Sequence, residues 1–206
     1  MAAEEAIQTE KLIKETAKKL FFQKGFLDAT TQEIADDAGV NRALIHYYFR
    51  SREQMLDMLL EETILEKKER VTRILSSALP FRQKIASYIN AVVDHGLEYP
   101  HLENFIVSET ARHPDKVKNL CTRYPTKSTD LIREQLAQEI RKKRLAPISP
   151  EHFMVNLVAL CNYPLLAKSI LKTVHGMTDT GYKKFLTERK KIIFSTIFGE
   201  EMPEVD

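Results

Sequence analysis

Residues 29–55 have the sequence ATTQEIADDAGVNRALIHYYFRSREQM, and this stretch decides the fold of the first part of the chain. Thr30 and Glu33 have the spacing of a capping box, in which a hydroxyl and a carboxylate satisfy each other's backbone N–H groups at a helix start. Gly39 can supply the positive φ that a sharp turn needs. Asn41 can cap the helix that follows. The stretch therefore predicts two short helices joined by a tight turn.

The sequence on either side adds two further helices. Upstream, residues 9–24 form an amphipathic pattern that ends near Gly25. Downstream, Ser51 and Gln54 have capping-box spacing and open a long helix that Pro80 cannot extend. The upstream apolar positions, at spacings of three and four, are Ile13, Ala17, Leu20 and Phe21.

The two short helices have the pattern of a helix-turn-helix. That motif needs small or apolar residues on the inner face of its first helix, a glycine in its turn and an apolar anchor in its second helix. The chain supplies these in order, as Ile34, Ala35, Ala38, Gly39, Val40 and Ile45. We therefore expect a DNA-binding head.

The remainder of the chain also predicts helices. Only 6 of 206 residues are glycine, tryptophan is absent, and long stretches are rich in good helix formers. The expected fold is all-α, with about nine helices in two domains: a three-helix helix-turn-helix domain at 1–55 and a second helical domain at 56–206. After Pro80 the predicted helices span 81–98, 101–113, 116–144 with a break near Pro125, 149–174 and 178–198.

Composition and charge indicate the cellular compartment and the class of protein. The formal net charge is only +2, so any DNA-binding surface must be a local patch. Cys121 and Cys161 lie far apart without CxxC spacing, which is typical of buried thiols in a reducing cytosol. Residues 1–10 lack the order of a signal peptide, and polar residues interrupt the apolar stretch 153–171. We expect a cytoplasmic protein with no membrane partner.

Several spaced elements resemble a known family. The sequence has LF-x3-GF at 20–26, then ATT, then IA-x2-AGV, then YF and S-R-E. Together these elements, within 13–55, are similar to the signature of the tetracycline-repressor (TetR) family. The resemblance implies a transcriptional regulator whose third helix enters the major groove of operator DNA. It also implies that residues 56–206 form a helical effector-binding and dimerisation domain.

The helical wheel of residues 42–49 predicts which side chains meet DNA. With Ile45 inward, Tyr48 and Phe49 share its packing face, whereas Ala43 and Tyr47 point outward. Leu44 and His46 depart from the commonest residues of the family at these positions, which leaves the operator sequence open. The predicted contacts to bases or phosphates are Thr31, Arg42, Ala43, Leu44, His46, Tyr47, Arg50 and Arg52.

The C-terminal segment suggests a dimer and a ligand pocket. Residues 153–171 are apolar on nearly all faces and must be covered on two sides, and 182–198 carry a broad apolar stripe. In the TetR family the last two helices usually form a four-helix dimer interface, so we expect a homodimer. Pro164 predicts a kink that can open a cavity. The candidate effector contacts are Tyr88, His95, Phe105, Glu109, Asn156, Cys161, Asn162 and Tyr163.

Two other classes of function are compared with this interpretation. An enzyme is not expected, because no Ser-His-Asp ordering, glycine-rich phosphate loop, HExxH or paired carboxylate motif occurs. A helix-turn-helix protein that senses no ligand, and acts through protein partners or chromosome organisation, remains the alternative. No cofactor and no metal are predicted, since Glu109 and His113 at i, i+4 lack the second pair that a tetrahedral site needs.

Overall fold

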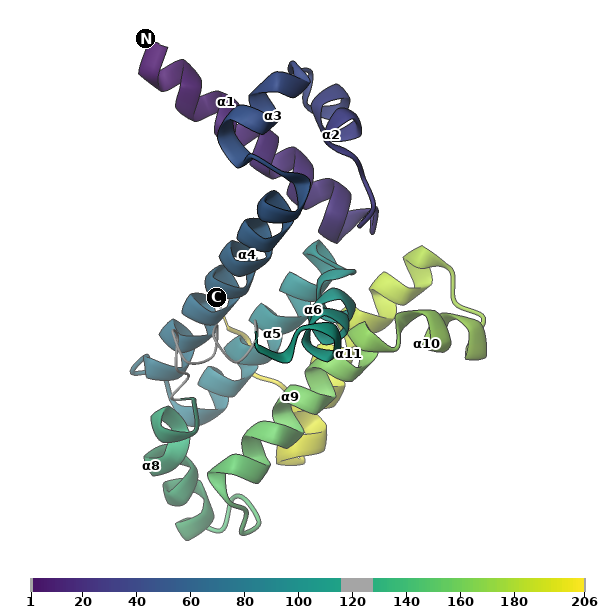
Figure 1. The fold of residues 1–206 in the computed structure, drawn as a ribbon. Helices are drawn as coiled ribbons and strands as arrows, with labels where there is room; N and C mark the ends of the chain where they lie inside the picture. Colours follow the sequence, from purple (N-terminus) through teal and green to yellow (C-terminus); the bar gives the residue numbers. More distant parts are fainter. Residues whose placement is uncertain (1, 116–127, 206) are drawn as a thin grey trace.

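The computed structural model describes residues 2–115 and 128–205, and within these ranges every regular element is helical (Figure 1). The all-α prediction is confirmed. The elements are α1 (Ala2–Lys18), the π-helix η1 (Lys19–Gln23), α2 (Thr31–Ala38), α3 (Arg42–Phe49), α4 (Arg52–Ser76), α5 (Phe81–Glu98), α6 (Leu102–Arg112), α8 (Ser128–Arg141), α9 (Pro150–Leu166), α10 (Lys168–Val174) and α11 (Asp179–Phe198).

The N-terminal head consists of α1, η1, α2 and α3, seated on the first turns of α4 (Figure 1). Its core is one apolar cluster that includes Ile13, Phe21, Ile34 and Ile45. Burial of such aliphatic and aromatic side chains contributes about 1.5–3 kcal/mol each, which is how a head of three short helices holds its shape. α1 begins at Ala2, several residues before the predicted start near residue 9.

A single π-turn at η1 connects α1 to the loop before α2, and the sequence pattern did not predict it. The backbone N–H of Lys24 donates to the carbonyl of Lys19, five residues back, at 2.9 Å. The wider turn allows three consecutive side chains to be buried, which a regular helical face does not do. These are Leu20, Phe21 and Phe22. The helix then stops at Gly25, as expected, with a φ of +79°.

The C-terminal lobe is built around α5, which is buried along most of its length. α4, α9 and α11 pack against it, and α8 packs against α4 and α9 (Figure 1). The lobe has its own apolar cluster, which includes Ile85 and Ile89 of α5, Leu157 of α9 and Leu186 of α11. The longest helix, α4, belongs to both parts, because it crosses the predicted domain boundary between 55 and 56.

The prediction of one helix across 149–174 is wrong. The chain forms α9 and then α10, with a break at Ala167 and a bend of 69° between the two helices. Pro164 lies inside α9 without ending it. A residue of α11 stabilises the turn at this proline, because the hydroxyl of Tyr182 donates to the carbonyl of Pro164 at 2.7 Å. The bend therefore comes three residues later than the proline that suggested it.

Within the described ranges, no single helix is both long enough and apolar enough to cross a bilayer. α9 and α10 reach that length and composition only as a sharply bent pair. Residues 116–127 of the predicted helix 116–144 lie outside the described residues, as does Cys121. Of the remaining residues, α8 covers 128–141.

Candidate nucleic-acid interface and effector site

The turn between α2 and α3 is fixed by the local interactions that the sequence predicts. The Thr30 hydroxyl accepts from the backbone N–H of Glu33 at 3.2 Å, and the Glu33 carboxylate accepts from that of Thr30 at 2.7 Å, so the capping box is complete. These hydrogen bonds lower the pKa of Glu33. Gly39 takes the left-handed conformation, and Asn41 caps α3 by accepting from the N–H of Ala43 at 2.8 Å. Of the second predicted capping box, only the hydrogen bond from the Gln54 N–H to the Ser51 hydroxyl is present.

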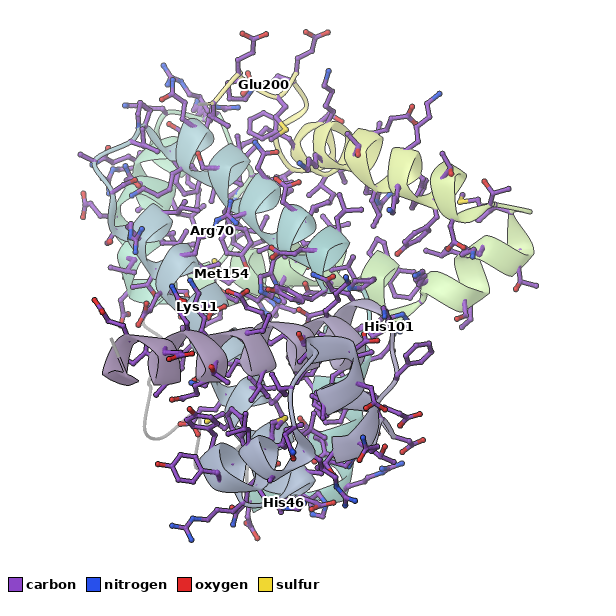
Figure 2. The ribbon with its side chains drawn as sticks, turned by 90° about the horizontal axis from the view of Figure 1, so that it is seen from above. Lys11, His46, Arg70, His101, Met154 and Glu200 are labelled. Carbon is purple, nitrogen blue, oxygen red and sulfur yellow. The ribbon has the colours of Figure 1, made fainter. Side chains whose placement is uncertain are left out.

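α3 presents one face to the core and the opposite face to solvent. Ile45 is 1% exposed and Phe49 is also buried, whereas Tyr47 is 77% exposed. Ala43 and His46 are exposed as well. In a view from above, Figure 2 shows His46 at the outer edge of the head. This outer face carries an alanine that permits close approach to a surface and two side chains that can donate or accept hydrogen bonds.

Three polar contacts fix α3 against its neighbours. Arg42 Nε donates to the hydroxyl of Thr31 at 3.0 Å, the Tyr48 hydroxyl donates to the carbonyl of Ala6 on α1 at 3.1 Å, and His46 Nδ1 lies 3.1 Å from the carbonyl of Arg50. Thr31 is itself buried. The Thr31 hydroxyl, which was predicted to contact a phosphate, thus accepts a hydrogen bond from Arg42. Arg42 itself is exposed.

Two of the predicted DNA contacts, Leu44 and Arg50, differ in how far they are exposed. Leu44 is half-buried and packs partly against the head cluster, so only part of its side chain faces outward. Arg50 is exposed at the end of α3, where its φ is +62°. A non-glycine residue in that region costs about 1–2 kcal/mol, so the tight reversal between α3 and α4 is held by its surroundings.

Arg52 is bound to the loop that precedes α2. Its Nε donates to the carbonyl of Ala29 at 2.8 Å, and its Nη2 donates to the carbonyl of Leu27. The guanidinium also lies 5.8 Å from the ring centroid of Phe21. Its donors are directed into the head, where they hold the loop before α2. We therefore propose a structural role for Arg52 in place of the predicted phosphate contact.

Lysines of the head are largely paired with acids. Lys14 donates to Glu62 at 2.8 Å and Lys18 to Glu66 at 2.9 Å, which ties α1 to α4. Exposed pairs of this kind contribute little to stability, about 0–1 kcal/mol. Their consequence is electrostatic, because they cancel positive charge on the side of α1 that meets α4.

Comparison with known proteins now identifies the head. Residues 13–59 match the family model described as "Bacterial regulatory proteins, tetR family". The helix-turn-helix head is therefore of the type found in TetR-family regulators.

Among curated TetR-type relatives, the probable HTH-type transcriptional regulator YttP of Bacillus subtilis is 24% identical over 198 residues, covering 93% of this chain and 95% of YttP. The B. subtilis regulator YhgD is 27% identical over 89 residues, covering 43% and 47%.

Two solved structures share the fold of this chain. An HlyIIR mutant has a TM-score of 0.63 at 21% identity, covering 94% of this chain and 98% of its own. A TetR/AcrR regulator from Thermobifida fusca has a TM-score of 0.56 at 18% identity, covering 91% and 96%. The match of the head to this family model supports a DNA-binding transcription regulator and agrees with the exposed face of α3.

The predicted effector contacts fall into two groups. Tyr88, His95 and Cys161 are all buried inside the C-terminal lobe. The carboxyl of Glu103 and the thiol of Cys161 both act electrostatically on the Tyr88 hydroxyl, which places α5, α6 and α9 side by side here. Burial raises the pKa of Cys161 to about 12, so its thiol is neutral.

His95 is the most unusual group in this interior. It is 6% exposed, and neither of its ring nitrogens has a hydrogen-bond partner among the described residues. Burial, followed by the nearby charges of Lys67, Arg70 and Lys18, lowers the pKa of His95 to about 4. An unsatisfied buried polar group costs about 1–3 kcal/mol, so a bound molecule that supplies a partner would gain affinity from it.

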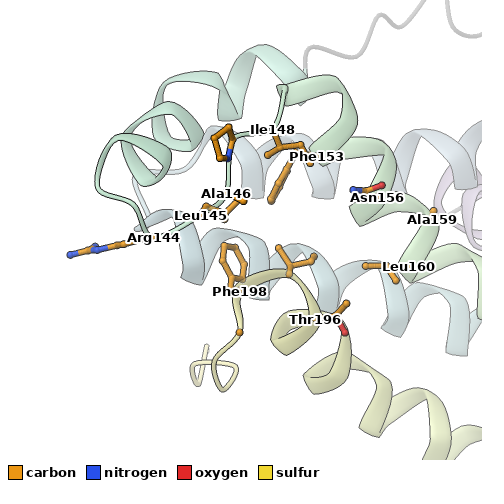
Figure 3. Close-up of a pocket in the computed structure, with 13 residues that line it drawn as sticks. Arg144, Leu145, Ala146, Ile148, Phe153, Asn156, Ala159, Leu160, Thr196 and Phe198 are labelled. Carbon is orange, nitrogen blue, oxygen red and sulfur yellow. The ribbon is translucent and has the colours of Figure 1, made fainter.

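The other predicted contacts lie elsewhere. Phe105 belongs to the head cluster, where its ring centroid is 6.0 Å from that of Phe22. Tyr163 is 58% exposed. Asn156 is exposed on α9 and lines a groove of about 680 Å³ at the far end of the lobe (Figure 3). Glu109 is half-buried on α6, and Asn162 is half-buried with an unpartnered buried Oδ1. None of these residues forms a hydrogen bond with a ring nitrogen of His95.

The sequence analysis missed charged residues near His95. Lys67 of α4 pairs with the buried Glu103 of α6, and Lys84 of α5 is buried on the same helix as Tyr88. The spacing of Lys84, four residues before Tyr88 and eleven before His95, is the signal that could have found it. Among the described residues, no three His, Cys, Asp or Glu side chains gather in a group that could hold a metal.

Proposed function

We propose that the chain is a ligand-responsive transcriptional repressor that binds palindromic operator DNA as a homodimer and is released by a small-molecule effector. The finding that carries the effector part is His95, a buried side chain with two unpaired nitrogens near the C-terminal end of α5. A protein that binds chromosomal DNA and a diffusing metabolite would act in the cytoplasm.

The exposed face of α3 supports the DNA part of the proposal. Ala43, His46 and Tyr47 form the centre of the surface that would enter the major groove, and Arg42 and Arg50 flank it. Contacts from His46 and Tyr47 to base edges would give sequence preference, whereas the arginines would meet phosphates and fix the register. The groove of B-DNA is about 12 Å wide and admits one helix of this kind.

The outer faces of α9 and α11 support the homodimer. α9 buries one side against the lobe and leaves Val155 63% exposed, with Val158 and Leu166 also exposed. Ile192 is 52% exposed on α11. Pairing of these faces about a two-fold axis would bury all four side chains, and the same axis would relate two heads to the halves of a palindrome.

Two connections could carry a signal from the interior to the head. α4 runs from the lobe into the head. α6 also touches the head, because the N–H of His101 donates to the carbonyl of Phe22 at 3.1 Å and Leu102 lies in the head cluster. An effector that shifts α6 or α4 would change the separation of the two heads. Coupling in such switches is typically about 1–3 kcal/mol, or roughly 5- to 150-fold in affinity.

The test has two stages. An operator is selected from a randomised DNA pool with the purified protein, and its Kd is measured by fluorescence anisotropy. Metabolites that raise the melting temperature are then added to the complex, since a ligand of the folded state stabilises it by mass action. We expect at least one such ligand to weaken operator binding by 5- to 150-fold. If all of them bind and leave the Kd unchanged, the alternative that senses no effector replaces this proposal.

A further inference from the structure

The hydrogen bond between His46 and Arg50 fixes which ring nitrogen of His46 carries the proton. His46 Nδ1 lies 3.1 Å from the carbonyl oxygen of Arg50. A carbonyl oxygen can only accept, so Nδ1 must be the protonated nitrogen of the neutral ring. The second nitrogen, Nε2, then carries a lone pair and no hydrogen. It is therefore a hydrogen-bond acceptor.

A strained turn makes the Arg50 carbonyl available to this ring. In a regular α-helix each carbonyl points toward the C-terminal end, away from the side chain four residues earlier. Arg50 instead has φ +62° and ψ −54°, and the N–H of Ser51 donates to the carbonyl of Phe49 at 2.7 Å. These values describe a γ-turn with positive φ, which is a rare and strained conformation. Backbone strain of this kind concentrates at functional sites.

His46 lies on the surface of α3 that would meet DNA. It is exposed, and Figure 2 shows it at the outer edge of the head. Ala43, one turn earlier, is also exposed and has no long side chain that could cover the ring. A neutral acceptor gains nothing from a phosphate, because phosphate oxygens also only accept. The partner that suits Nε2 is therefore a donor on a base edge.

The major groove offers one such donor in each base pair. Adenine presents its N6 amino group and cytosine its N4 amino group, whereas guanine and thymine present acceptors and, on thymine, a methyl group. An acceptor at a fixed position thus distinguishes amino bases from keto bases on the strand that it faces. Arg42 and Arg50 cannot select an amino base in this way, because a guanidinium group only donates.

We propose that His46 is a specificity-determining residue of the head, and that its Nε2 accepts a hydrogen bond from the amino group of an adenine or a cytosine in each operator half-site. This rests on the proposed function and adds the chemistry of the base that one side chain selects. Arg50 is a positioning residue, since its carbonyl holds the ring in the accepting tautomer.

The first experiment measures the tautomer without DNA. Two-bond ¹H–¹⁵N NMR spectra of the ¹⁵N-labelled full chain are recorded at pH 8, above the usual titration range of histidine. We expect a protonated Nδ1 at His46, and His46→Asn assigns the signal by its loss. The exposed His152 of α9 is the reference ring. A protonated Nε2 at His46, or the average of both tautomers that a freely rotating ring would show, overturns the inference.

The second experiment locates the base in an operator selected from a randomised DNA pool. Single amino groups are deleted within one half-site, with purine in place of adenine or 2-pyrimidinone in place of cytosine. Kd is measured for the wild type, His46→Asn and the exposed control His152→Asn. Asparagine keeps a donor near the position of Nδ1 but has no atom at the position of Nε2.

At one position, the deletion should weaken wild-type binding roughly 2- to 10-fold, as expected for one neutral hydrogen bond. The same deletion should leave the binding of His46→Asn unchanged, because its acceptor is already gone. Deletions at the other positions should affect both proteins alike. His152→Asn should behave as the wild type at every position.

The inference is overturned if no deletion weakens wild-type binding, if His46→Asn loses as much as the wild type at every position, or if its change in preference falls on a guanine or a thymine. An equal loss of affinity for operator and scrambled DNA would also overturn it, because His46 would then contact phosphate. A pool that yields no operator would contradict the proposed function, and the NMR spectrum would still decide whether Nδ1 carries the proton.

Discussion

A Cβ atom placed on Gly25 would lie 2.8 Å from Nδ1 of His101. The loop that leaves the first helix of the head therefore passes directly against the start of α6. Figure 2 shows His101 where the head meets the C-terminal lobe. Together with the hydrogen bond between His101 and Phe22, this makes α6 a second joint between the two parts of the molecule, beside the continuous helix α4.

Gly25→Ala should destabilise the protein by about 2–5 kcal/mol. About 1–2 kcal/mol comes from a side chain at a φ of +79°, and about 1–3 kcal/mol from the collision with the His101 ring. Gly176→Ala is the matched control, because its φ is +61° and a Cβ there meets nothing within 4 Å. Urea unfolding of both variants measures the difference. Adding His101→Ala should recover the steric part of the loss, and a double variant as unstable as Gly25→Ala would contradict the contact.

Arg52→Ala should lower the free energy of unfolding by about 1–3 kcal/mol, since two backbone carbonyls of the loop before α2 lose their donor. The salt dependence of DNA binding should stay as in the wild type. Arg50→Ala should show the opposite pattern, with stability within about 0.5 kcal/mol of wild type and a salt slope lower by about one per half-site. If Arg52→Ala instead keeps the stability of the wild type and lowers the salt slope of DNA binding, Arg52 is the phosphate contact and this account is contradicted.

If α9 and α11 of two copies form the proposed four-helix interface, Val158→Glu combined with Ile192→Glu should make the protein monomeric. Two glutamates buried without partners at the centre of an interface should weaken dimerisation by roughly 30-fold or more, or about 2 kcal/mol. Val107→Glu on α6 is the control, because Val107 is comparably exposed but lies on another helix. Light scattering over a range of concentrations distinguishes the two. A dimer that survives the double change, or dissociates with Val107→Glu, would exclude this face.

Stability should fall on acidification because of His95. Its folded pKa is about 4 and its unfolded pKa about 6.5, so the unfolded chain binds more protons between these values. The stability that His95 contributes to the folded state is fully present above pH 6.5. It is lost as the pH falls toward 4, by about 3 kcal/mol in total. His95→Leu should flatten this part of the stability curve in urea unfolding from pH 7 to pH 4.5. Parallel curves for the two proteins would mean that the imidazole is solvated.

Local chemistry made the head predictable. The residues that set the turn are cap and glycine positions, Thr30, Glu33, Gly39 and Asn41, and each interaction acts within four residues. The exposed position of Tyr47 follows from the same short range, because helix geometry alone places it opposite Ile45.

The interior of the lobe was harder to predict, because its contacts join distant segments. Tyr88, His95 and Cys161 were found from residue type, but Phe105 packs against Phe22 across more than eighty residues. Apolar periodicity does not reveal which of two cores a phenylalanine joins. The break at Ala167 likewise depends on how α9 packs, with the Tyr182 hydroxyl holding the carbonyl of Pro164. The π-turn at η1 is a small insertion that periodicity also misses.

The most direct test of the DNA-binding account is the operator preference of Tyr47→Ala and Ile45→Ala, measured as Kd on operator and scrambled DNA at several salt concentrations, with circular dichroism beside it. Tyr47 is exposed, so its loss should reduce discrimination by about 1–3 kcal/mol per half-site and leave helicity and the dimer intact. Ile45 is in the core, so its loss should destabilise the head by about 2–5 kcal/mol. A Tyr47→Ala protein that keeps full discrimination, or that loses helicity as Ile45→Ala does, would contradict the placement of α3 in the groove.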